Sequence, residues 1–299
     1  MFGGDFEKYA GEAFNKALLN SVKIDNFLDV DEMITLDDLQ QKIEYGKFKF
    51  TDDEYREIKA INSSSIKQGD KDIIYMDYSL SGYSLNEKSK SLGIGSMFHF
   101  YLLEEEQFNK LYYFSDRHID GRSKKEIVNE MLKNGYKIRI DLKDAEIMKR
   151  MKDSAFKNQY VEKLLNKPGE CEQTILWKNS DYNLNCKMKA DKIISDNPIL
   201  LDIKTSKESS EKSFRSDFNK FGYNIQASFY KDGFEQFTGS KLEYFFFIVF
   251  GKNFPYVCNI YEVSIATLAK SKDDYYRIIK NYIDYKNDPS IIKTRVYTL

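Results

Sequence analysis

Three charged residues, Asp191, Asp202 and Lys204, have the types and spacing that metal-assisted hydrolysis requires. Two apolar runs flank a turn-forming Ser-Asp-Asn-Pro segment, which predicts a β-hairpin with Ile194 paired to Ile199. Asp191 then faces Asp202, and Lys204 shares the face of Asp202 because side chains alternate along a strand. Two carboxylates that close repel each other unless a cation lies between them, and a hard divalent cation prefers oxygen ligands. The lysine could stabilise negative charge or orient a water molecule.

Chance alone could also produce part of this pattern. The chain has 46 Lys and Arg and 47 Asp and Glu among 299 residues, so an Asp-x-Lys triplet is expected several times. Such a triplet is more often a solvated strand end than a catalytic site. The apolar run Ile199–Leu201 before it and the opposed Asp191 favour the catalytic interpretation.

The elements that must position these residues alternate between helices and strands. Helices are expected at about 93–104, 141–165, 216–236 and 265–287, and strands at about 170–177, 182–194, 199–206, 241–250 and 256–263. Residues 1–60 show helical spacing and no evident chemistry. We therefore expect a helical N-terminal extension over 1–60 and one larger domain over 61–299.

Two glutamates on the first of these strands leave two interpretations open. If residues 178–181 form the turn, Trp177 pairs with Tyr182, Glu172 faces Lys187, and Glu170 faces the next lysine along. Both glutamates then lie on the face that carries Asp191. They either form cross-strand pairs with lysines or supply a third carboxylate to the metal site.

Three further features also have alternative interpretations. His99, one of two histidines, lies in the middle of an apolar helix, where a lone histidine is usually a hydrogen-bonded core residue and becomes a ligand only beside the hairpin. Gln226 and Tyr230 share one helix face, although residues at such spacing are more often core. The charge-rich stretch 116–150 is either a solvated surface or a patch that contacts phosphates.

The composition describes a soluble globular protein, with 41% hydrophobic and 31% charged residues. The net charge of −1 means that contact with DNA would need local clusters of lysine and arginine. The three cysteines have no metal-ligand spacing, and their odd number favours a reducing cytoplasm. The longest apolar run, Tyr244–Phe250, is too short to cross a membrane, so no membrane association is expected.

The order of elements resembles the core of the PD-(D/E)XK nucleases, and its details resemble their RecE-type and RecB-type exonuclease branch, a more distant relative of lambda exonuclease. The resemblance covers roughly residues 62–288 and is carried by four blocks: Gly-Ser-Met-Phe-His at 95–99, Lys-Ala-Asp-Lys-Ile at 189–193, Asp-Ile-Lys-Thr at 202–205, and a segment at 222–233 that begins Gly-Tyr-Asn-Ile-Gln. Ala190 replaces the proline that precedes the aspartate in some members. The four cysteines that bind an iron–sulfur cluster in some relatives are missing, so no cluster is expected.

The resemblance implies an α/β fold with a restriction-endonuclease-like core, in which helices flank a central mixed sheet, preceded by the N-terminal helical extension. It implies that His99, Asp191, Asp202 and the carbonyl of Ile203 bind Mg²⁺ or Mn²⁺, with two ions in each active site. Lys204 would activate or position the attacking water. The last implied members of the site, Gln226 and Tyr230, would support the DNA end.

The implied function is a metal-dependent exodeoxyribonuclease of phage-type homologous recombination. It would digest one strand of linear duplex DNA, in the 5′→3′ direction, and leave a 3′ overhang for a single-strand annealing protein. Relatives form closed rings, so a trimeric or tetrameric homo-oligomer in the cytoplasm of a bacterial host is expected. The alternatives are a structure- or site-specific endonuclease of the same superfamily and a non-catalytic DNA-binding scaffold, against which the intact Asp191, Asp202 and Lys204 argue.

Overall fold

The computed structural model describes residues 33–83, 90–114 and 142–294, together with positions 126, 129, 133, 135 and 138–140. From Ile34 onward the chain forms one compact unit. Its helices are α2 (Leu36–Gln40), α3 (Asp52–Glu57), α4 (Ser63–Lys71), α5 (Ile73–Leu80), α6 (Lys90–Leu103), α7 (Glu105–Leu111), α9 (Leu142–Lys157), α10 (Gln159–Asn166), α11 (Glu211–Lys220), α12 (Tyr223–Thr238), α13 (Ile265–Asn287) and the 3₁₀ helix η2 (Pro289–Thr294). Its strands are β1 (Gly46–Phe48), β2 (Tyr112–Phe114), β3 (Ile138–Ile140), β4 (Glu170–Asn179), β5 (Leu184–Ile194), β6 (Ile199–Ser206), β7 (Tyr244–Gly251) and β8 (Cys258–Glu262).

The central sheet has six strands in the order β1-β4-β5-β6-β7-β8, and a separate two-stranded sheet joins β2 to β3. Within the six-stranded sheet β6 and β7 run parallel, joined through α11 and α12, while the other neighbouring pairs are antiparallel. A parallel pair needs a long crossover connection, which these two helices supply. The predicted α/β fold with a mixed central sheet flanked by helices is confirmed.

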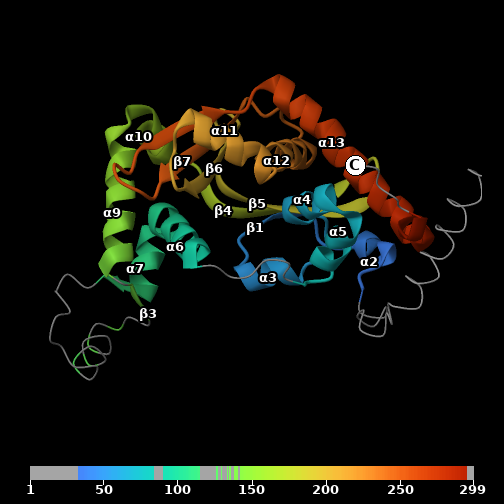
Figure 1. Ribbon diagram of the computed structural model, residues 1–299, viewed down its shortest axis with the longest axis horizontal. Coiled ribbons are helices and arrows are strands. Elements are labelled where there is room, and N and C mark those ends of the chain that lie inside the picture. The colour runs from blue at the N-terminus through green and yellow to red at the C-terminus, as the bar shows by residue number, and fades with distance from the viewer. Residues whose placement is uncertain are drawn as a thin grey trace, which may run out of the picture. The chain divides into compact units, whose positions relative to one another are not determined.

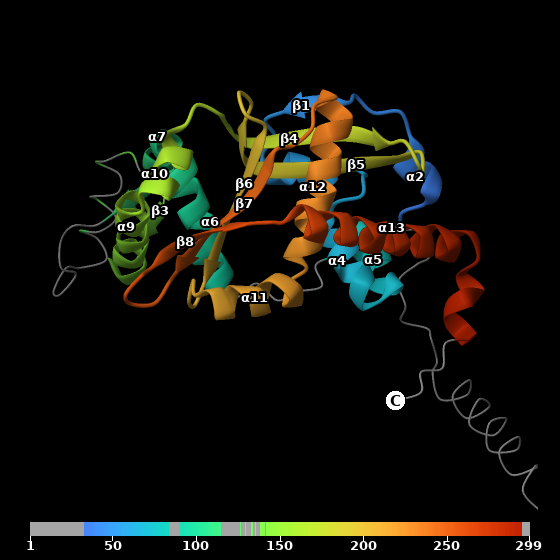
Figure 2. The same ribbon diagram turned by 90° about the horizontal axis from the view of Figure 1, so that it is seen from above.

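Helices cover both faces of the sheet (Figures 1 and 2). One hydrophobic cluster joins α4, α5, α12 and α13 to the sheet, and a second joins α6, α9 and α10 to its other face. Strand β6 alternates between them, because Leu200 belongs to the first cluster whereas Leu201 and Ile203 belong to the second. The alternation places Asp202 and Lys204 on the face covered by α12.

The β5–β6 hairpin has the predicted register. Ile194 pairs with Ile199, and the ladder continues to the pair of Lys192 with Leu201. The regular pairing ends there, one step before the two aspartates. The strands therefore diverge at the point where Asp191 and Asp202 face each other.

The predicted register of β4 against β5 was wrong by four residues. Trp177 pairs with Cys186 rather than with Tyr182, because β4 continues to Asn179 before the turn. The Asn179 side chain accepts hydrogen bonds from the backbone N–H groups of Asp181 and Tyr182, which fixes the turn at residues 180–183. A shift of four residues keeps every side chain on its predicted face and changes only the partners.

The helix predicted at about 216–236 is two helices, α11 and α12. They are separated at Phe221 and Gly222, and Gly222 has a φ of 62°, a left-handed conformation that favours glycine. The long helix predicted at 265–287 is confirmed as α13. Strands β1, β2 and β3 were not predicted.

Two predictions fall largely outside the described residues. Most of the charge-rich stretch 116–150 before α9 lies there, so the proposed phosphate patch stays a prediction. The first 32 residues of the predicted extension lie there too; its described part contains α2, α3 and β1, which pairs with β4. The division into 1–60 and 61–299 stays a prediction. Among the described residues, no helix is both long and apolar enough to span a membrane.

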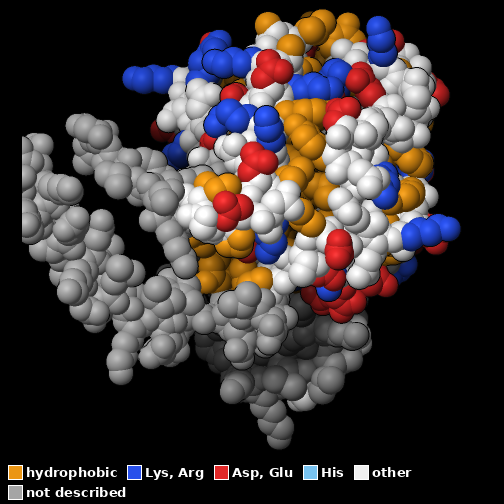
Figure 3. Space-filling view, turned by 90° about the vertical axis from the view of Figure 1, so that its right-hand side faces the viewer, with side chains coloured by type: hydrophobic (Ala, Val, Ile, Leu, Met, Phe, Trp, Pro, Cys, Tyr) orange, Lys and Arg blue, Asp and Glu red, His pale blue; other side chains and the backbone are white. Residues whose placement is uncertain are grey.

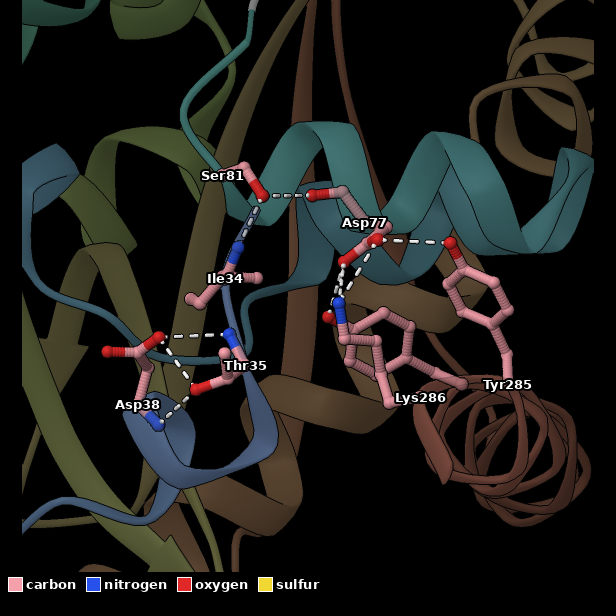
Figure 4. Close-up of polar contacts among 8 residues, drawn as sticks. Ile34, Thr35, Asp38, Asp77, Ser81, Tyr285 and Lys286 are labelled. Carbon is pink, nitrogen blue, oxygen red and sulfur yellow. Dashed lines mark hydrogen bonds and ion pairs between the residues drawn. The ribbon is translucent and has the colours of Figure 1, made fainter. Parts of the chain in front are cut away.

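A buried carboxylate ties the N-terminal helices to the last helix (Figure 4). Asp77 on α5 is 1% exposed and accepts hydrogen bonds from the hydroxyl groups of Tyr282 and Tyr285 on α13. The ammonium of Lys286 lies 3.0 Å from the same carboxylate. Because Asp77 is fully paired, α5 and α13 are fixed to each other beneath the sheet.

Candidate metal centre

Four predicted site residues meet where β5 and β6 diverge. The carboxylate of Asp191 accepts a hydrogen bond from the backbone N–H of Ile203, at 2.6 Å, in place of a strand-to-strand bond. The same oxygen lies 3.5 Å from Nδ1 of His99 on α6, and the backbone of Ile203 also hydrogen-bonds the imidazole. The condition set for His99 as a ligand, that its helix packs beside the hairpin, is met.

Asp202 is the most buried acid of the group, at 3% exposure. One carboxylate oxygen, Oδ1, accepts a hydrogen bond from the side-chain amide of Gln226 at 2.5 Å. The other, Oδ2, forms an ion pair with the ammonium of Lys204. One oxygen of this buried carboxylate is therefore held by an amide, while the other faces the ammonium of Lys204.

Lys67 is a member of this group that the sequence patterns did not identify. Its ammonium donates a hydrogen bond to Oε1 of Gln226 at 2.9 Å, so it orients the amide that holds Asp202. Lys67 comes from α4, which begins after the N-cap Asn62. Nothing in the local pattern distinguishes this lysine from the chain's other lysines.

Two tyrosines of α12 surround the same residues. Lys204 lies over the ring of Tyr223, 4.9 Å from its centroid, which adds a cation–π contact. Tyr230 is 7% exposed and hydrogen-bonds Ser63 at the start of α4. Tyr230 therefore packs behind the site, and the support of a DNA end by Gln226 and Tyr230 stays a prediction.

Glu172 satisfies both interpretations that the sequence left open. The corrected register places it across from Asp191, and ligand atoms of His99, Glu172 and Asp191 all lie within 4.8 Å of one another. It also lies 3.2 Å from the ammonium of Lys189. Glu170, by contrast, is half exposed and forms an ion pair with Lys47 outside the group.

The electrostatics of the group reflect burial and the crowding of acids. Burial, with Asp202 nearby, raises the pKa of Asp191 to about 7, and burial with Asp191 nearby raises the pKa of Glu172 to about 7. Burial lowers the pKa of His99, and Lys204 adds to this effect, so the imidazole is a neutral nitrogen donor near pH 7. Burial alone would lower the pKa of Lys204, but Asp202 and Asp191 outweigh it and raise that pKa.

Two cavities adjoin the group and share Ser96 and His99. The lysine groove, about 720 Å³, is lined by Lys67, Lys204, Lys207, Lys220 and Lys252 among others. The carboxylate pocket, about 380 Å³, is lined by Asp52, Glu104, Glu172, Lys189 and Asp191 among others. A divalent cation and a phosphodiester would therefore have adjacent surfaces of opposite charge.

The residues present fit a divalent metal. Oxygen ligands of Mg²⁺ lie at ~2.1 Å from the ion and thus roughly 3–4 Å from one another, so donors within 4.8 Å need only small side-chain movements. Asp202 adds a carboxylate oxygen that already lies against a cationic group, the ammonium of Lys204. An imidazole with several carboxylates suits Mn²⁺ as well as Mg²⁺.

Comparisons with known proteins agree with this fold. A crystal structure described as "Putative exonuclease" from Eubacterium rectale superposes with a TM-score of 0.55 at 19% identity, covering 84% of this chain and 96% of that one. A crystal structure of SSO0001 gives a TM-score of 0.26 at 14% identity, over 77% and 88% of the two chains, and supports no argument. A comparison with curated protein sequences returns no match.

A family model covers most of the chain. It matches residues 63–290, which include the four blocks and the metal-ligand candidates, and it describes a PDDEXK-like domain of unknown function. The PD-(D/E)XK core that the resemblance implied is thus found by an independent comparison. The chain belongs to this family of PDDEXK-like domains, DUF3799.

Proposed function

We propose that this protein is a divalent-metal-dependent exodeoxyribonuclease that digests one strand of linear duplex DNA. The observation that carries the proposal is the meeting of Asp191, Asp202 and Lys204 with His99 at the edge of the lysine groove. Carboxylates that bind a cation, next to lysines that bind phosphates, form the arrangement that phosphodiester hydrolysis requires. The fold shared with a protein described as an exonuclease supports the end-dependent form of the reaction.

The lysine groove accounts for DNA contact by a chain of net charge −1. Besides Lys204, four lysines line it, together with the single acid Asp217. Affinity for DNA depends on phosphates neutralised locally rather than on total charge. The groove therefore supplies a path for the backbone of one strand toward the metal centre.

The side chains then have distinct roles. Lys204, partly buried and positively charged, positions the attacking water and stabilises negative charge that develops on the phosphate. Gln226, fixed by Lys67, holds Asp202 in one orientation. A bound Mg²⁺ or Mn²⁺ ion supplies Lewis-acid activation of water and of the phosphate.

The finer parts of the proposal follow the resemblance to the RecE-type and RecB-type exonucleases. Digestion runs 5′→3′ and leaves a 3′ overhang that a single-strand annealing protein receives. The protein assembles as a closed ring of three or four copies around DNA. Polarity is tested by the order in which 5′-labelled and 3′-labelled strands release their label, and ring size by light scattering of the purified protein.

The central test compares linear with covalently closed circular duplex DNA in the presence of Mg²⁺. An exonuclease consumes only the linear form, because it needs an end. Asp202→Ala should abolish digestion, whereas Asp196→Ala, which changes an exposed aspartate in the turn of the same hairpin, should not.

Two other outcomes would overturn the proposal. Cleavage of both forms would identify a structure- or site-specific endonuclease of the same superfamily. Cleavage of neither form, with DNA binding retained, would identify a non-catalytic scaffold.

A further inference from the structure

The carboxylate pocket contains a lysine among four acids. Lys189, on β5 two residues before Asp191, is 20% exposed, and its ammonium lies 3.2 Å from Glu172 and 2.7 Å from Asp52. Asp52 is the first residue of α3 and is 68% exposed. Lys189 thus contacts two carboxylates: Glu172, which lies close to His99 and Asp191, and Asp52, which is exposed at the rim of the pocket.

Glu172 differs from an ordinary salt-bridge residue. Its neighbour two residues earlier, Glu170, is 44% exposed and forms an ion pair with Lys47, whereas Glu172 is 18% exposed and lies against His99 and Asp191. Its backbone has a φ of 55°, a left-handed conformation inside a strand that residues other than glycine rarely adopt. Glu172 is therefore directed into the group of donors by a local distortion of β4.

We propose that Glu172, with Asp191 and His99, forms a divalent-cation position beyond the family's His-Asp-Asp ligands, and that Lys189 is its internal counter-ion. When a cation binds, Lys189 leaves Glu172 and pairs with Asp52 alone. The inference rests on the proposed function in that it treats the group as a metal centre. It adds a fourth protein side chain to that centre and a lysine that competes with the metal.

The charges of the pocket require such a counter-ion. Three acidic side chains, Glu172, Asp191 and Asp202, lie close together, and like charges that are poorly hydrated repel strongly. Lys204 pairs with Asp202, and Lys189 pairs with Glu172. A divalent cation next to Glu172 would repel the ammonium of Lys189, and Asp52 provides an exposed partner already within contact.

Competition between Lys189 and the metal for Glu172 predicts that substitutions of these two residues change metal affinity in opposite directions. Glu172→Gln removes a ligand and should weaken Mn²⁺ binding at one position by about tenfold or more. Lys189→Met removes the competing charge and should strengthen binding there by a similar factor. Asp52→Asn removes the acceptor of the displaced lysine and should weaken binding. Glu170→Gln, the matched control on the same strand, should leave binding unchanged.

The test measures Mn²⁺ binding to the full chain without DNA, by calorimetry and by the electron paramagnetic resonance of free Mn²⁺. Wild-type protein should bind two ions, and Glu172→Gln should lose the affinity of one. Glu172→Asp, which keeps the carboxylate on a shorter stem, should bind with intermediate affinity, which separates a ligand role from a folding defect. Circular dichroism in the presence of a chelator checks that each variant is folded.

The inference is overturned if Glu172→Gln binds Mn²⁺ as Glu170→Gln does, or if Lys189→Met weakens binding. Digestion of linear DNA by wild-type protein is measured separately. Two Mn²⁺ ions bound without digestion would refute the proposed function and leave the cation position intact. Digestion together with unchanged binding by Glu172→Gln would refute only the cation position.

Discussion

The three acids of the metal centre, Glu172, Asp191 and Asp202, have different partners. Asp202 pairs with Lys204 and Glu172 with Lys189, but Asp191 is held by the backbone N–H of Ile203. A hydrogen bond from the backbone orients a carboxylate without neutralising its charge. Asp191 is therefore the acid of the three that the backbone orients, rather than a paired lysine.

The pH dependence of stability follows from Asp191 and Glu172. Their pKa values, raised from 3.8 and 4.5 to about 7, mean that folding disfavours their charged forms. Their contribution to stability is complete below pH ~4 and is lost as the pH rises through about 7. We expect Mg²⁺ to raise the melting temperature more at pH 8 than at pH 6, because protons no longer compete for the carboxylates. An equal shift at both pH values in calorimetric scans would contradict this.

Lys67 should matter to catalysis through Gln226. Hydrogen bonds to charged groups contribute ~1.5–3 kcal/mol, so Lys67→Met should slow DNA digestion by roughly 10- to 100-fold. Lys71→Met, one turn further along α4 and exposed, is the matched control. The rates are measured on linear duplex at saturating Mg²⁺. Equal rates for the two variants would show that Gln226 needs no second anchor.

At the scale of elements, the site depends on how helices are fixed to the sheet. Helix α12 presents Gln226 to Asp202, and it packs between the sheet and α13. Helix α13 is in turn fixed to α5 by the Asp77 cluster. The position of Gln226 is therefore set through two successive helix contacts.

Removing Asp77 should loosen α13. Asp77→Ala leaves Lys286 without its partner and two tyrosine hydroxyls without an acceptor, so the free energy of unfolding should fall by about 3 kcal/mol. Urea denaturation followed by circular dichroism measures the change. Asp70→Ala, at an exposed position of α4, should change stability by no more than about 0.5 kcal/mol. A similar loss in both variants would show that the cluster has no special role.

Gly233 should resist substitution because α12 lies against Trp177 of β4. A Cβ atom at Gly233 would come 2.6 Å from the indole ring, so Gly233→Ala should destabilise the protein by about 1–3 kcal/mol. Replacing Trp177 with leucine makes room for the methyl group. In a double-mutant cycle the two changes should therefore cost less together than the sum of their separate effects. Strict additivity would show that α12 accommodates the methyl group without contact.

The helices and strands near the motifs could be predicted from the sequence, but the pairing of the strands could be predicted only in part. The β5–β6 register follows from one short turn, so the pairing of Ile194 with Ile199 was predicted correctly. The β4–β5 turn was misplaced because residues 178–183 are all compatible with a turn, and only the side-chain bonds of Asn179 select among them. Glu172 nevertheless kept its face, because the error was an even number of residues.

Some residues reach the site only because their helices pack against the sheet, and no local sequence pattern predicts them. Lys67 and Asp52 lie on α4 and α3, far along the chain from β5 and β6, and reach the site because those helices dock beside the sheet. A lysine or aspartate on a short helix is ordinarily a solvated residue. Such contributions depend on tertiary contacts that the spacing of a single segment does not encode.

At the scale of the molecule, most of the surface in view in Figure 3 mixes charges of both signs, whereas the lysine groove is mainly basic. Basic and acidic side chains are interspersed on the face shown in Figure 3, in agreement with a net charge of −1. The lysine groove, with five lysines and the single acid Asp217, departs from that balance. Binding to DNA should therefore depend on this groove.

The salt dependence of DNA binding tests the groove. Each phosphate contact contributes roughly −0.9 to the slope of log affinity against log salt, so Lys220→Gln should reduce the slope by about one. Lys280→Gln, at an exposed position on α13, should leave the slope unchanged. Binding is measured with a chelator present so that no DNA is cut. Equal slopes for the two variants would place the DNA path elsewhere.

The metal centre draws its parts from α3, α4, α6, β4, β5, β6 and α12, and Gln226 is the last of them to be synthesised. A ribosome-bound chain that has already produced both aspartates and Lys204 still lacks the residue that holds Asp202. Contacts between distant parts of a chain form late in folding. The order of synthesis therefore means that a partly made copy cannot assemble the complete group of side chains before α12 has been produced.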